Sequence, residues 1–365
     1  MRGGNRGFEL AFHRNAHVWL LRVGNLAIVL VSSLLGLLLS EGLVQVIAPQ
    51  ELKGQLYAFA PRGYKVLRAE GQSFVEHEGT RIIYRFAPPH LRGAPAPAGA
   101  KRVLMLGDSF TEGWLLQEEE SYAGRLQQRL DKTFGSGRIA LLNAGTSGSG
   151  TADHLAFLED YGDMIAPHTV VAFISIDDFG RAERSGLYRL TAAGSLAPSA
   201  IPRNQYVDAV ITSPLYTFLS EHFQIMQLAR HMAGMIAPRT ANQNATTGPT
   251  PIKLTSLPTV TESQKQLARA LFLGMKIWCD SRGVPFIVIN NGWRRYDWLE
   301  EMLEADDITV FDAAPFVHKE AFTDLPSFTI TNDSHPNSKG AAVTANAIWP
   351  SLTTFLVENG LLMSN

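Results

Sequence analysis

The sequence predicts an α/β protein in which a five-stranded parallel sheet is covered by helices on both faces, behind an apolar N-terminal segment. Three observations predict this class. From residue 101 onward, short apolar runs alternate with longer amphipathic stretches, the pattern of βαβ units. One run, residues 169–176, is almost wholly apolar, as expected for a strand covered on both faces. Polar, glycine-containing turns follow several of the runs. Together they indicate a three-layer α/β/α architecture.

The predicted elements follow one another without an internal repeat. Strands are expected at residues 103–106, 139–142, 169–176, 284–289 and 308–311. Helices are expected at residues 121–134, 151–164, 261–282, 293–304 and 338–358. The main domain is therefore predicted over residues 101–360.

Composition and charge exclude several classes of protein. The 365 residues carry a net charge of −2 and contain no basic block, which argues against a nucleic-acid partner. The only cysteine, Cys279, lies in an apolar helical stretch, where a packed core residue is expected. One thiol rules out an intramolecular disulfide framework and a cysteine-based zinc site. We expect neither a metal nor a cofactor.

The N-terminal segment has the composition of a membrane anchor. Residues 23–40 carry no charge, and further apolar residues extend the run to residue 47, about the length that crosses a bilayer as a helix. Four arginines and one acid precede it: Arg2, Arg6, Arg14 and Arg22, with Glu9. This excess of positive charge predicts a single-pass protein of the inner membrane, with residues 1–22 in the cytoplasm and the rest periplasmic or extracellular. A cleaved signal peptide is the competing interpretation.

Two segments fall outside the regular alternation. Residues 49–100 predict a small β extension that ends in a linker rich in proline and alanine. Residues 179–260 form a long insertion after the third strand, with a helical part at 213–235 and a flexible part at 240–251. Because the insertion leaves the carboxyl end of a strand, we expect either a lid or substrate-binding surface, or a helical pair packed on the sheet.

Ser109 is the candidate nucleophile. It follows an apolar run that stops at Gly107, so it is expected at the carboxyl end of a buried strand, where open α/β sheets place their ligand sites. A serine hydroxyl needs a general base, which a third group orients. His335 lies two residues after Asp333 in a polar turn before the last helix. At that spacing the carboxylate can hold one imidazole nitrogen while the other nitrogen faces Ser109.

A glycine-rich turn supplies candidate donors for an oxyanion. Residues 143–151 follow the second strand, and their glycines let a backbone N–H approach a substrate closely. A phosphate-binding loop is the competing interpretation. It is disfavoured because neither the P-loop nor the dinucleotide-binding glycine spacing is present and no lysine follows.

The sequences at residues 107–109, 143–148 and 333–337 resemble the motifs of the SGNH, or GDSL-type, esterase and acyltransferase family, in its membrane-anchored bacterial form. The resemblance runs from residue 101 to about residue 358, apart from the insertion. It implies a flavodoxin-like fold, with Ser109 as nucleophile and Asp333 and His335 as its partners. It also implies the N–H groups of Ser109 and Gly148 as oxyanion donors. Four further residues are implied as supports around the site: Asp108, Asn143, Gly145 and Asp178.

The sequence after the third predicted strand, residues 175–178, departs from the family pattern. After the third strand the family has an asparagine whose side chain donates to the oxyanion, and here Asp177 stands at that position. An ionised carboxylate accepts hydrogen bonds only and repels an oxyanion. Three outcomes are open. Asp177 is protonated, or it turns away while backbone groups, Asn290 or Asn291 donate instead, or the protein is weakly active.

Residues and resemblance together predict a membrane-anchored, outward-facing serine esterase or O-acyltransferase that works through an acyl-serine intermediate. The resemblance implies O-acyl groups such as acetyl, on exported polysaccharide or wall glycan, as the substrate, and a membrane acyl-donor protein as a further partner. The alternatives are a lipid or small-ester hydrolase at the membrane surface, and a non-catalytic scaffold or carbohydrate-binding member of a secretion complex. Four aromatic residues are candidates for stacking on sugar rings or for core packing: Trp114, Trp293, Tyr296 and Trp298.

Overall fold

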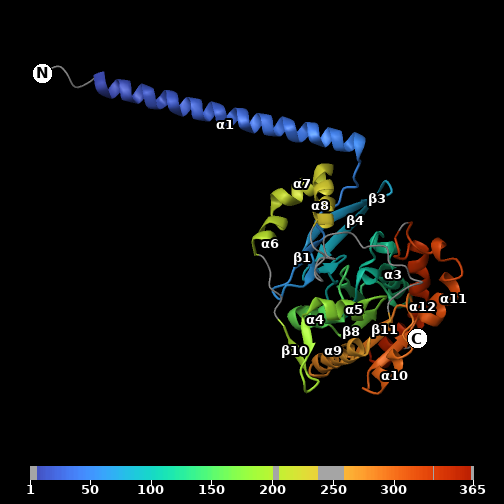
Figure 1. Ribbon diagram of the computed structural model, residues 1–365. Coiled ribbons are helices and arrows are strands. Elements are labelled where there is room, and N and C mark those ends of the chain that lie inside the picture. The colour runs from blue at the N-terminus through green and yellow to red at the C-terminus, as the bar shows by residue number, and fades with distance from the viewer. Residues whose placement is uncertain (1–5, 200–204, 237–258, 332, 363–365) are drawn as a thin grey trace.

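The computed structural model describes residues 6–199, 205–236, 259–331 and 333–362. Among these residues, the centre is an eight-stranded sheet in the order β12-β11-β8-β6-β7-β5-β4-β3 (Figure 1). Five neighbouring strands are parallel: β12 (Thr309–Asp312), β11 (Phe286–Asn290), β8 (Thr169–Ile174), β6 (Lys101–Leu106) and β7 (Ile139–Asn143). They confirm the predicted five-stranded parallel sheet. Three antiparallel strands continue it: β5 (Leu91–Arg92), β4 (Thr80–Ala87) and β3 (Gly71–His77).

Helices cover both faces of the sheet, as predicted (Figure 1). One face packs against α4 (Thr151–Ile165), α5 (Asp178–Ser185) and α9 (Glu262–Asp280), and the other against α3 (Tyr122–Phe134), α11 (Ala314–Ala321) and α12 (Ser338–Glu358). Successive residues of β6 enter opposite cores. Leu104 and Leu106 pack in the first, and Val103 and Met105 in the second. Because side chains alternate across a strand, a strand covered on both faces must be apolar at every position.

One helix is shorter than the sequence predicts. A helix is expected over residues 293–304, but α10 spans only Leu299–Glu304. The side chain of Asn291 accepts a hydrogen bond from the N–H of Trp293 (3.3 Å), a local turn that competes with a helix. The Trp293 side chain is buried and donates to Thr344 Oγ1 on α12 (2.9 Å). These contacts hold the first half of the segment in a loop.

The N-terminal extension is fastened to the sheet and to the turn after Ser109. Strands β1 (Tyr57–Phe59) and β2 (Lys65–Leu67) form a separate antiparallel pair. Arg92 of β5 pairs with Asn143 of β7, and its guanidinium donates to the carbonyl oxygen of Gly113 (2.7 Å). Residues 49–100 therefore contribute strands to the same sheet that carries the candidate nucleophile.

The described part of the insertion continues after α5 with a hairpin and three helices: β9 (Tyr188–Leu190), β10 (Leu196–Pro198), α6 (Gln205–Ile211), α7 (Pro214–His222) and α8 (Gln224–Ile236). Helices α7 and α8 correspond to the predicted helical part, and the predicted flexible part at 240–251 lies outside the described residues. Glu41 accepts hydrogen bonds from the N–H groups of Gln224 (2.8 Å) and Ile225 (2.9 Å). Helix α8 therefore begins against the end of the N-terminal helix (Figure 1).

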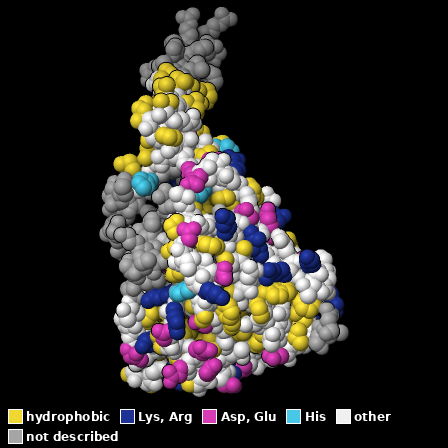
Figure 2. All heavy atoms as spheres, turned by 90° about the vertical axis from the view of Figure 1, so that its right-hand side faces the viewer, with side chains coloured by type: hydrophobic (Ala, Val, Ile, Leu, Met, Phe, Trp, Pro, Cys, Tyr) yellow, Lys and Arg dark blue, Asp and Glu magenta, His cyan; other side chains and the backbone are white. Residues whose placement is uncertain are grey.

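The N-terminal helix α1 (Arg6–Ile47) projects from the globular part (Figure 1). Its segment Arg22–Ile47 reaches a mean hydropathy of 2.2 and is long and apolar enough to cross a membrane. A secretory signal sequence meets the same criterion. Figure 2 shows hydrophobic side chains around the described part of α1, and charged side chains of both signs over the globular part. The predicted apolar segment is thus a helix, and its insertion in a membrane stays a prediction.

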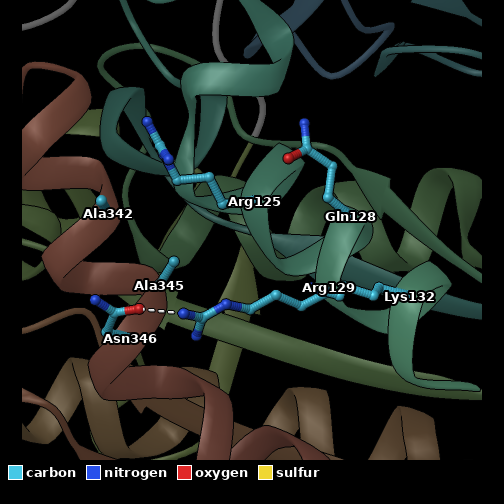
Figure 3. A pocket seen from close by; sticks show the side chains of 7 residues that line it. All are labelled: Arg125, Gln128, Arg129, Lys132, Ala342, Ala345 and Asn346. Atoms are coloured by element: carbon cyan, nitrogen blue, oxygen red, sulfur yellow. Dashed lines mark hydrogen bonds between the residues drawn. The ribbon is translucent and has the colours of Figure 1, made fainter.

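Helices α3 and α12 meet at a polar pocket of about 210 Å³ (Figure 3). Its lining consists of Arg125, Gln128, Arg129 and Lys132 from α3, with Ala342, Ala345 and Asn346 from α12. Arg129 donates to the side chain of Asn346, and Arg125 donates to Ser338 Oγ (2.7 Å). Ser338 is the first residue of α12, three residues after His335, so these bonds fix the position of the segment that carries the candidate base.

Candidate active site

Ser109 lies just beyond the carboxyl end of β6, as predicted, and is the first residue of the short helix α2 (Ser109–Glu112). Gly107 permits the turn, because an added Cβ would lie 1.9 Å from Thr111 Oγ1. Asp108 Oδ1 accepts the N–H of Phe110 (2.9 Å) and so caps α2. Ser109 is only 2% exposed, so the surrounding residues enclose it almost completely.

A buried charge cluster lies behind this turn. Arg181 Nη1 donates to Asp108 Oδ2 (2.6 Å) and lies 3.6 Å from Asp178 Oδ1. Burial, together with the charge of Asp108, raises the pKa of Asp178 well above its ordinary value. Asp108 and Asp178, which the resemblance implies as supports around the site, thus lie close together. Arg181, which offsets their charge, carries no motif and was not predicted.

His335 and Asp333 complete a hydrogen-bonded chain with Ser109. His335 Nε2 lies 2.7 Å from Ser109 Oγ, and His335 Nδ1 is hydrogen-bonded to Asp333 Oδ1. Asp333 Oδ1 also accepts the backbone N–H of His335 (2.9 Å), which fits their two-residue spacing. Burial alone would raise the pKa of Asp333, but the hydrogen bonds and charge of His335 outweigh it and hold the pKa below its ordinary value. An ionised Asp333 requires a proton on Nδ1, which leaves the Nε2 lone pair facing Ser109.

The glycine-rich loop packs against α2 through its predicted residues. Asn143 Nδ2 donates to the carbonyl oxygen of Thr111 (2.7 Å), and Asn143 Oδ1 accepts the N–H of Gly145 (2.9 Å). A Cβ at Gly145 would lie 2.3 Å from the backbone nitrogen of Glu112, so the loop can approach α2 only with glycine there. Gly148 has a φ of +82° and is the one exposed residue between 142 and 150.

Glu112 links this loop to the extension, and sequence reasoning missed it. Its carboxylate is fully buried and accepts hydrogen bonds from Tyr57 Oη (2.9 Å) and from the N–H of Ser147 (2.5 Å). The buried carboxylate of Glu112 therefore joins α2 to the extension, through Tyr57, and to the glycine-rich loop, through Ser147. The available signal was an acidic residue within the small, buried turn that follows Ser109.

Asp177 is turned away from any role as a donor. Arg184 Nη2 donates to Asp177 Oδ2 (2.5 Å), and Arg181 Nε lies 4.0 Å from the same oxygen. Both arginines belong to α5, so the carboxylate lies along the helix that it precedes. This geometry agrees with the turning away of Asp177 in the second of the three outcomes, and the substitute donor stays a prediction. Asn290 does not substitute, because its Nδ2 donates to the carbonyl oxygen of Arg294 (2.8 Å).

Two lysines of the extension lie over aromatic rings near the same site, and neither was predicted. Lys53 Nζ is 4.1 Å from the ring centroid of Trp114, and Lys65 Nζ is 4.4 Å from that of Tyr57. Burial lowers the pKa of Lys53 to about 7 and that of Lys65 to about 8, although the charge of Glu112 opposes both shifts.

Most of the aromatic residues considered for sugar stacking belong to the core. Trp114, Trp293 and Tyr296 are at most 5% exposed, so stacking on a sugar is the wrong interpretation for these three. Trp298 is half-buried. Cys279 is fully buried, and burial raises the pKa of its thiol to about 12, which agrees with the predicted core position.

The arrangement as a whole has the chemistry of nucleophilic catalysis. A serine hydroxyl bonded to an imidazole, whose other nitrogen is held by a carboxylate, is activated for attack on a carbonyl carbon. Within the described ranges, no group of three or more His, Cys, Asp or Glu side chains converges in a way that would hold a metal ion.

Comparison with known families agrees with this chemistry. Residues 105–343 match the GDSL-like Lipase/Acylhydrolase family, well over half of the chain. The chain belongs to this family and is an ester hydrolase. A search of curated proteins finds no matching sequence.

Solved structures of esterases are among the similar folds. The psychrotrophic esterase EstA from Pseudoalteromonas sp. has a TM-score of 0.40 and 12% identity, covering 70% of this chain and 98% of the esterase. A two-domain esterase active on acetylated mannans has a TM-score of 0.41 and 15% identity, covering 72% of this chain and 51% of its own. Axe2, an acetylxylan esterase from Geobacillus stearothermophilus, has a TM-score of 0.38 and 15% identity, covering 74% of this chain and 100% of its own.

Proposed function

We propose that this ester hydrolase is a serine esterase or O-acyltransferase, anchored by α1 with its globular part outside the cytoplasm. Its substrate is an O-acyl group, such as acetyl, on exported polysaccharide or wall glycan. The observation that carries the proposal is the continuous chain of hydrogen bonds from Ser109 Oγ through His335 to Asp333.

The proposed reaction uses each member of that chain once in each half-reaction. Ser109 Oγ attacks the ester carbonyl while His335 Nε2 takes the hydroxyl proton, and Asp333 stabilises the resulting imidazolium. The N–H groups of Ser109 and Gly148 are the proposed donors to the oxyanion. His335 returns the proton to the leaving alcohol, and the acyl group stays on Ser109. Water or a sugar hydroxyl then accepts the acyl group by the reverse sequence.

Three features support the finer parts of the proposal. The near-complete enclosure of Ser109 favours a small acyl group, since 2% exposure leaves little room beside the hydroxyl. The arginine-rich start of the chain favours an outward orientation of everything after α1. The contact of Glu41 with the start of α8 would hold the globular part close to the end of the anchor.

The test is hydrolysis of 4-nitrophenyl acetate by the full-length protein in detergent, compared with Ser109→Ala. We expect kcat/KM to fall by at least about 10³-fold, because the acyl-enzyme can no longer form. The matched control is Ser136→Ala, which removes an exposed hydroxyl from a turn and should leave the rate unchanged. Equal rates for wild type and Ser109→Ala would reject the mechanism. Adding acetylated polysaccharide, with or without a sugar acceptor, then separates release of acetate from transfer.

A second candidate function is hydrolysis of lipid or small esters at the membrane surface. It is favoured by exposed apolar side chains on α6 and α7, where Val210, Leu215 and Phe218 are 58%, 68% and 51% exposed. Activity on vesicle-borne esters that exceeds activity on acetylated polysaccharide would select it. The non-catalytic scaffold is disfavoured, because a lapsed site has no need to keep Ser109 Oγ 2.7 Å from His335 Nε2.

A further inference from the structure

The space above Gly148 is occupied by a single cation. Gly148 is exposed while its neighbours in the loop are buried. A Cβ added at Gly148 would lie 3.4 Å from Lys65 Nζ. Apart from the chain neighbours of Gly148, this is the only heavy atom within 4 Å of that point in the described part of the chain. The ammonium group therefore lies beside Gly148, the residue whose N–H is proposed to bind the oxyanion.

Lys65 is held there by a chain of contacts that reaches the loop itself. Its ammonium lies over the ring of Tyr57, and Tyr57 Oη donates to Glu112 (2.9 Å). Glu112 in turn accepts hydrogen bonds from the N–H and the hydroxyl of Ser147, both at 2.5 Å, and Ser147 precedes Gly148. The strand pairing of Phe59 with Lys65 fixes the two strands relative to each other. The lysine and the loop are thus positioned as one unit.

The site lacks the side-chain donor that the family resemblance implies. Asp177 occupies the position of the asparagine, accepts from Arg184, and carries no proton to donate when ionised. Apart from Asn291, whose buried Nδ2 has no hydrogen-bond partner among the described residues, backbone N–H groups would then face a full negative charge in an enclosed site. An ammonium group is the strongest kind of donor that could meet that charge, because the hydrogen bond is charge-assisted.

We propose that Lys65 is a catalytic residue, whose ammonium donates a hydrogen bond to the oxyanion beside the Gly148 N–H and takes the role of the absent asparagine. This inference rests on the proposed function. As Ser109 Oγ bonds to the carbonyl carbon, the π electrons of the carbonyl move to its oxygen and His335 takes the serine proton. Lys65 keeps all of its protons. When the tetrahedral intermediate collapses, the bond to the leaving oxygen breaks and His335 protonates that oxygen.

Because Lys65 is proposed to act through its charge, the proposal predicts how the activity depends on pH. Burial lowers its pKa to about 8, so the ammonium persists at neutral pH and is lost as the pH rises through 8. The groups that face it come from every neighbouring segment: Lys53 and Tyr57 from the extension, Glu112 from α2, Asp153 from α4 and Arg181 from α5. Lys53 and Arg181 repel the charged form, and Glu112 and Asp153 favour it.

The experiment measures kcat and KM for 4-nitrophenyl acetate from pH 6 to about pH 10 with full-length protein. Lys65→Met keeps the aliphatic stem over Tyr57 and removes the charge, and Lys65→Arg keeps a charge that is permanent in this range. We expect Lys65→Met to lower kcat about 100-fold at pH 7, the usual loss for one oxyanion donor, with KM within about twofold. Lys65→Arg should retain most of kcat. Wild type should lose activity above about pH 8, while Lys65→Arg keeps it.

The matched control is Lys276→Met, which removes a lysine that pairs with Asp280 (3.0 Å) at the far end of α9. Equal kcat for Lys65→Met and Lys276→Met would overturn the proposal. So would a rise in KM alone, which would make Lys65 a residue of substrate binding and not of oxyanion stabilisation. If Lys65→Met does not fold, the test is the comparison of wild type with Lys65→Arg. An identical dependence of kcat on pH above about pH 8 in these two proteins would overturn the proposal. Loss of activity in Ser109→Ala tests the proposed function separately.

Discussion

The two sides of Ser109 are built in different ways. On one side, His335 and Asp333 come from a single turn, and each polar contact joins residues that the motifs already name. On the other side, the loop around Gly148 is held by Glu112 of α2 and approached by Lys65 of the distant N-terminal extension. The first side is local in sequence, and the second exists only when the extension folds onto the sheet.

The residues that activate the nucleophile are therefore separate from the residues proposed to stabilise the oxyanion that its attack creates. The acid–base side keeps the whole set of groups that its chemistry needs. On the oxyanion side, Asp177 stands where the family resemblance implies an asparagine, and it accepts a hydrogen bond from Arg184. A site can therefore match its family at the nucleophile and depart from it at the oxyanion, because the two functions are carried by separate structures.

The largest effect is expected on the local side, from Asp333→Asn. The amide cannot stabilise an imidazolium and favours the wrong tautomer of His335, so kcat should fall about 10⁴-fold with little change in thermal unfolding. The measurement is steady-state hydrolysis of 4-nitrophenyl acetate. Asp307→Asn, which alters a fully exposed carboxylate, is the control and should match wild type. A loss below about tenfold would mean that the carboxylate does not orient the base.

A smaller effect, mainly on stability, is expected on the distant side from Glu112→Ala. The change leaves Tyr57 Oη and the Ser147 N–H without their acceptor, at a cost of about 2–5 kcal/mol in the free energy of unfolding. For a domain of this size the melting temperature should fall by roughly 5–15 °C. Thermal unfolding of the full-length protein measures it, with the exposed Glu119→Ala as control. An unchanged melting temperature would show that the extension is not held through this carboxylate.

The smallest effect is expected from Asp177→Asn. Because the side chain lies along α5 and bonds to Arg184, an amide there should stay out of the oxyanion site and change kcat less than about threefold. Steady-state kinetics on the acetate ester measure this change. A rise of tenfold or more would contradict the geometry and return Asp177 to the oxyanion site.

The sequence predicts the local side well for a physical reason. A strand covered on both faces must be apolar throughout, so β6, β8 and β11 are visible as runs, and the turn after β6 carries the Ser109 motif. The His–Asp turn is closed by a hydrogen bond between residues two apart, which spacing can reveal. Ser109, Asp333 and His335 are accordingly brought together where the sequence places them.

The contacts on the distant side correspond to no such local pattern in the sequence. Strand β4 is buried at alternate positions through Phe86, as expected for an antiparallel strand with one covered face. Its place beside β5, which in turn pairs with β7, depends on contacts that no local pattern encodes. Lys65 lies close to Gly148, and Arg181 donates to Asp108, and in both cases the two residues are far apart in sequence. The start of α10 was misplaced for a related reason, since Trp293 is held by Thr344 on another helix.

The most direct test of the account is the identity of the residue that a fluorophosphonate labels. This reagent phosphonylates a serine only when a neighbouring base activates it. Intact-mass and peptide measurements on the full-length protein should find one adduct, on Ser109, that is absent from Ser109→Ala and forms much more slowly in His335→Ala. Labelling of Ser109→Ala at the wild-type rate, on any other residue, would contradict the assignment of Ser109 as the nucleophile.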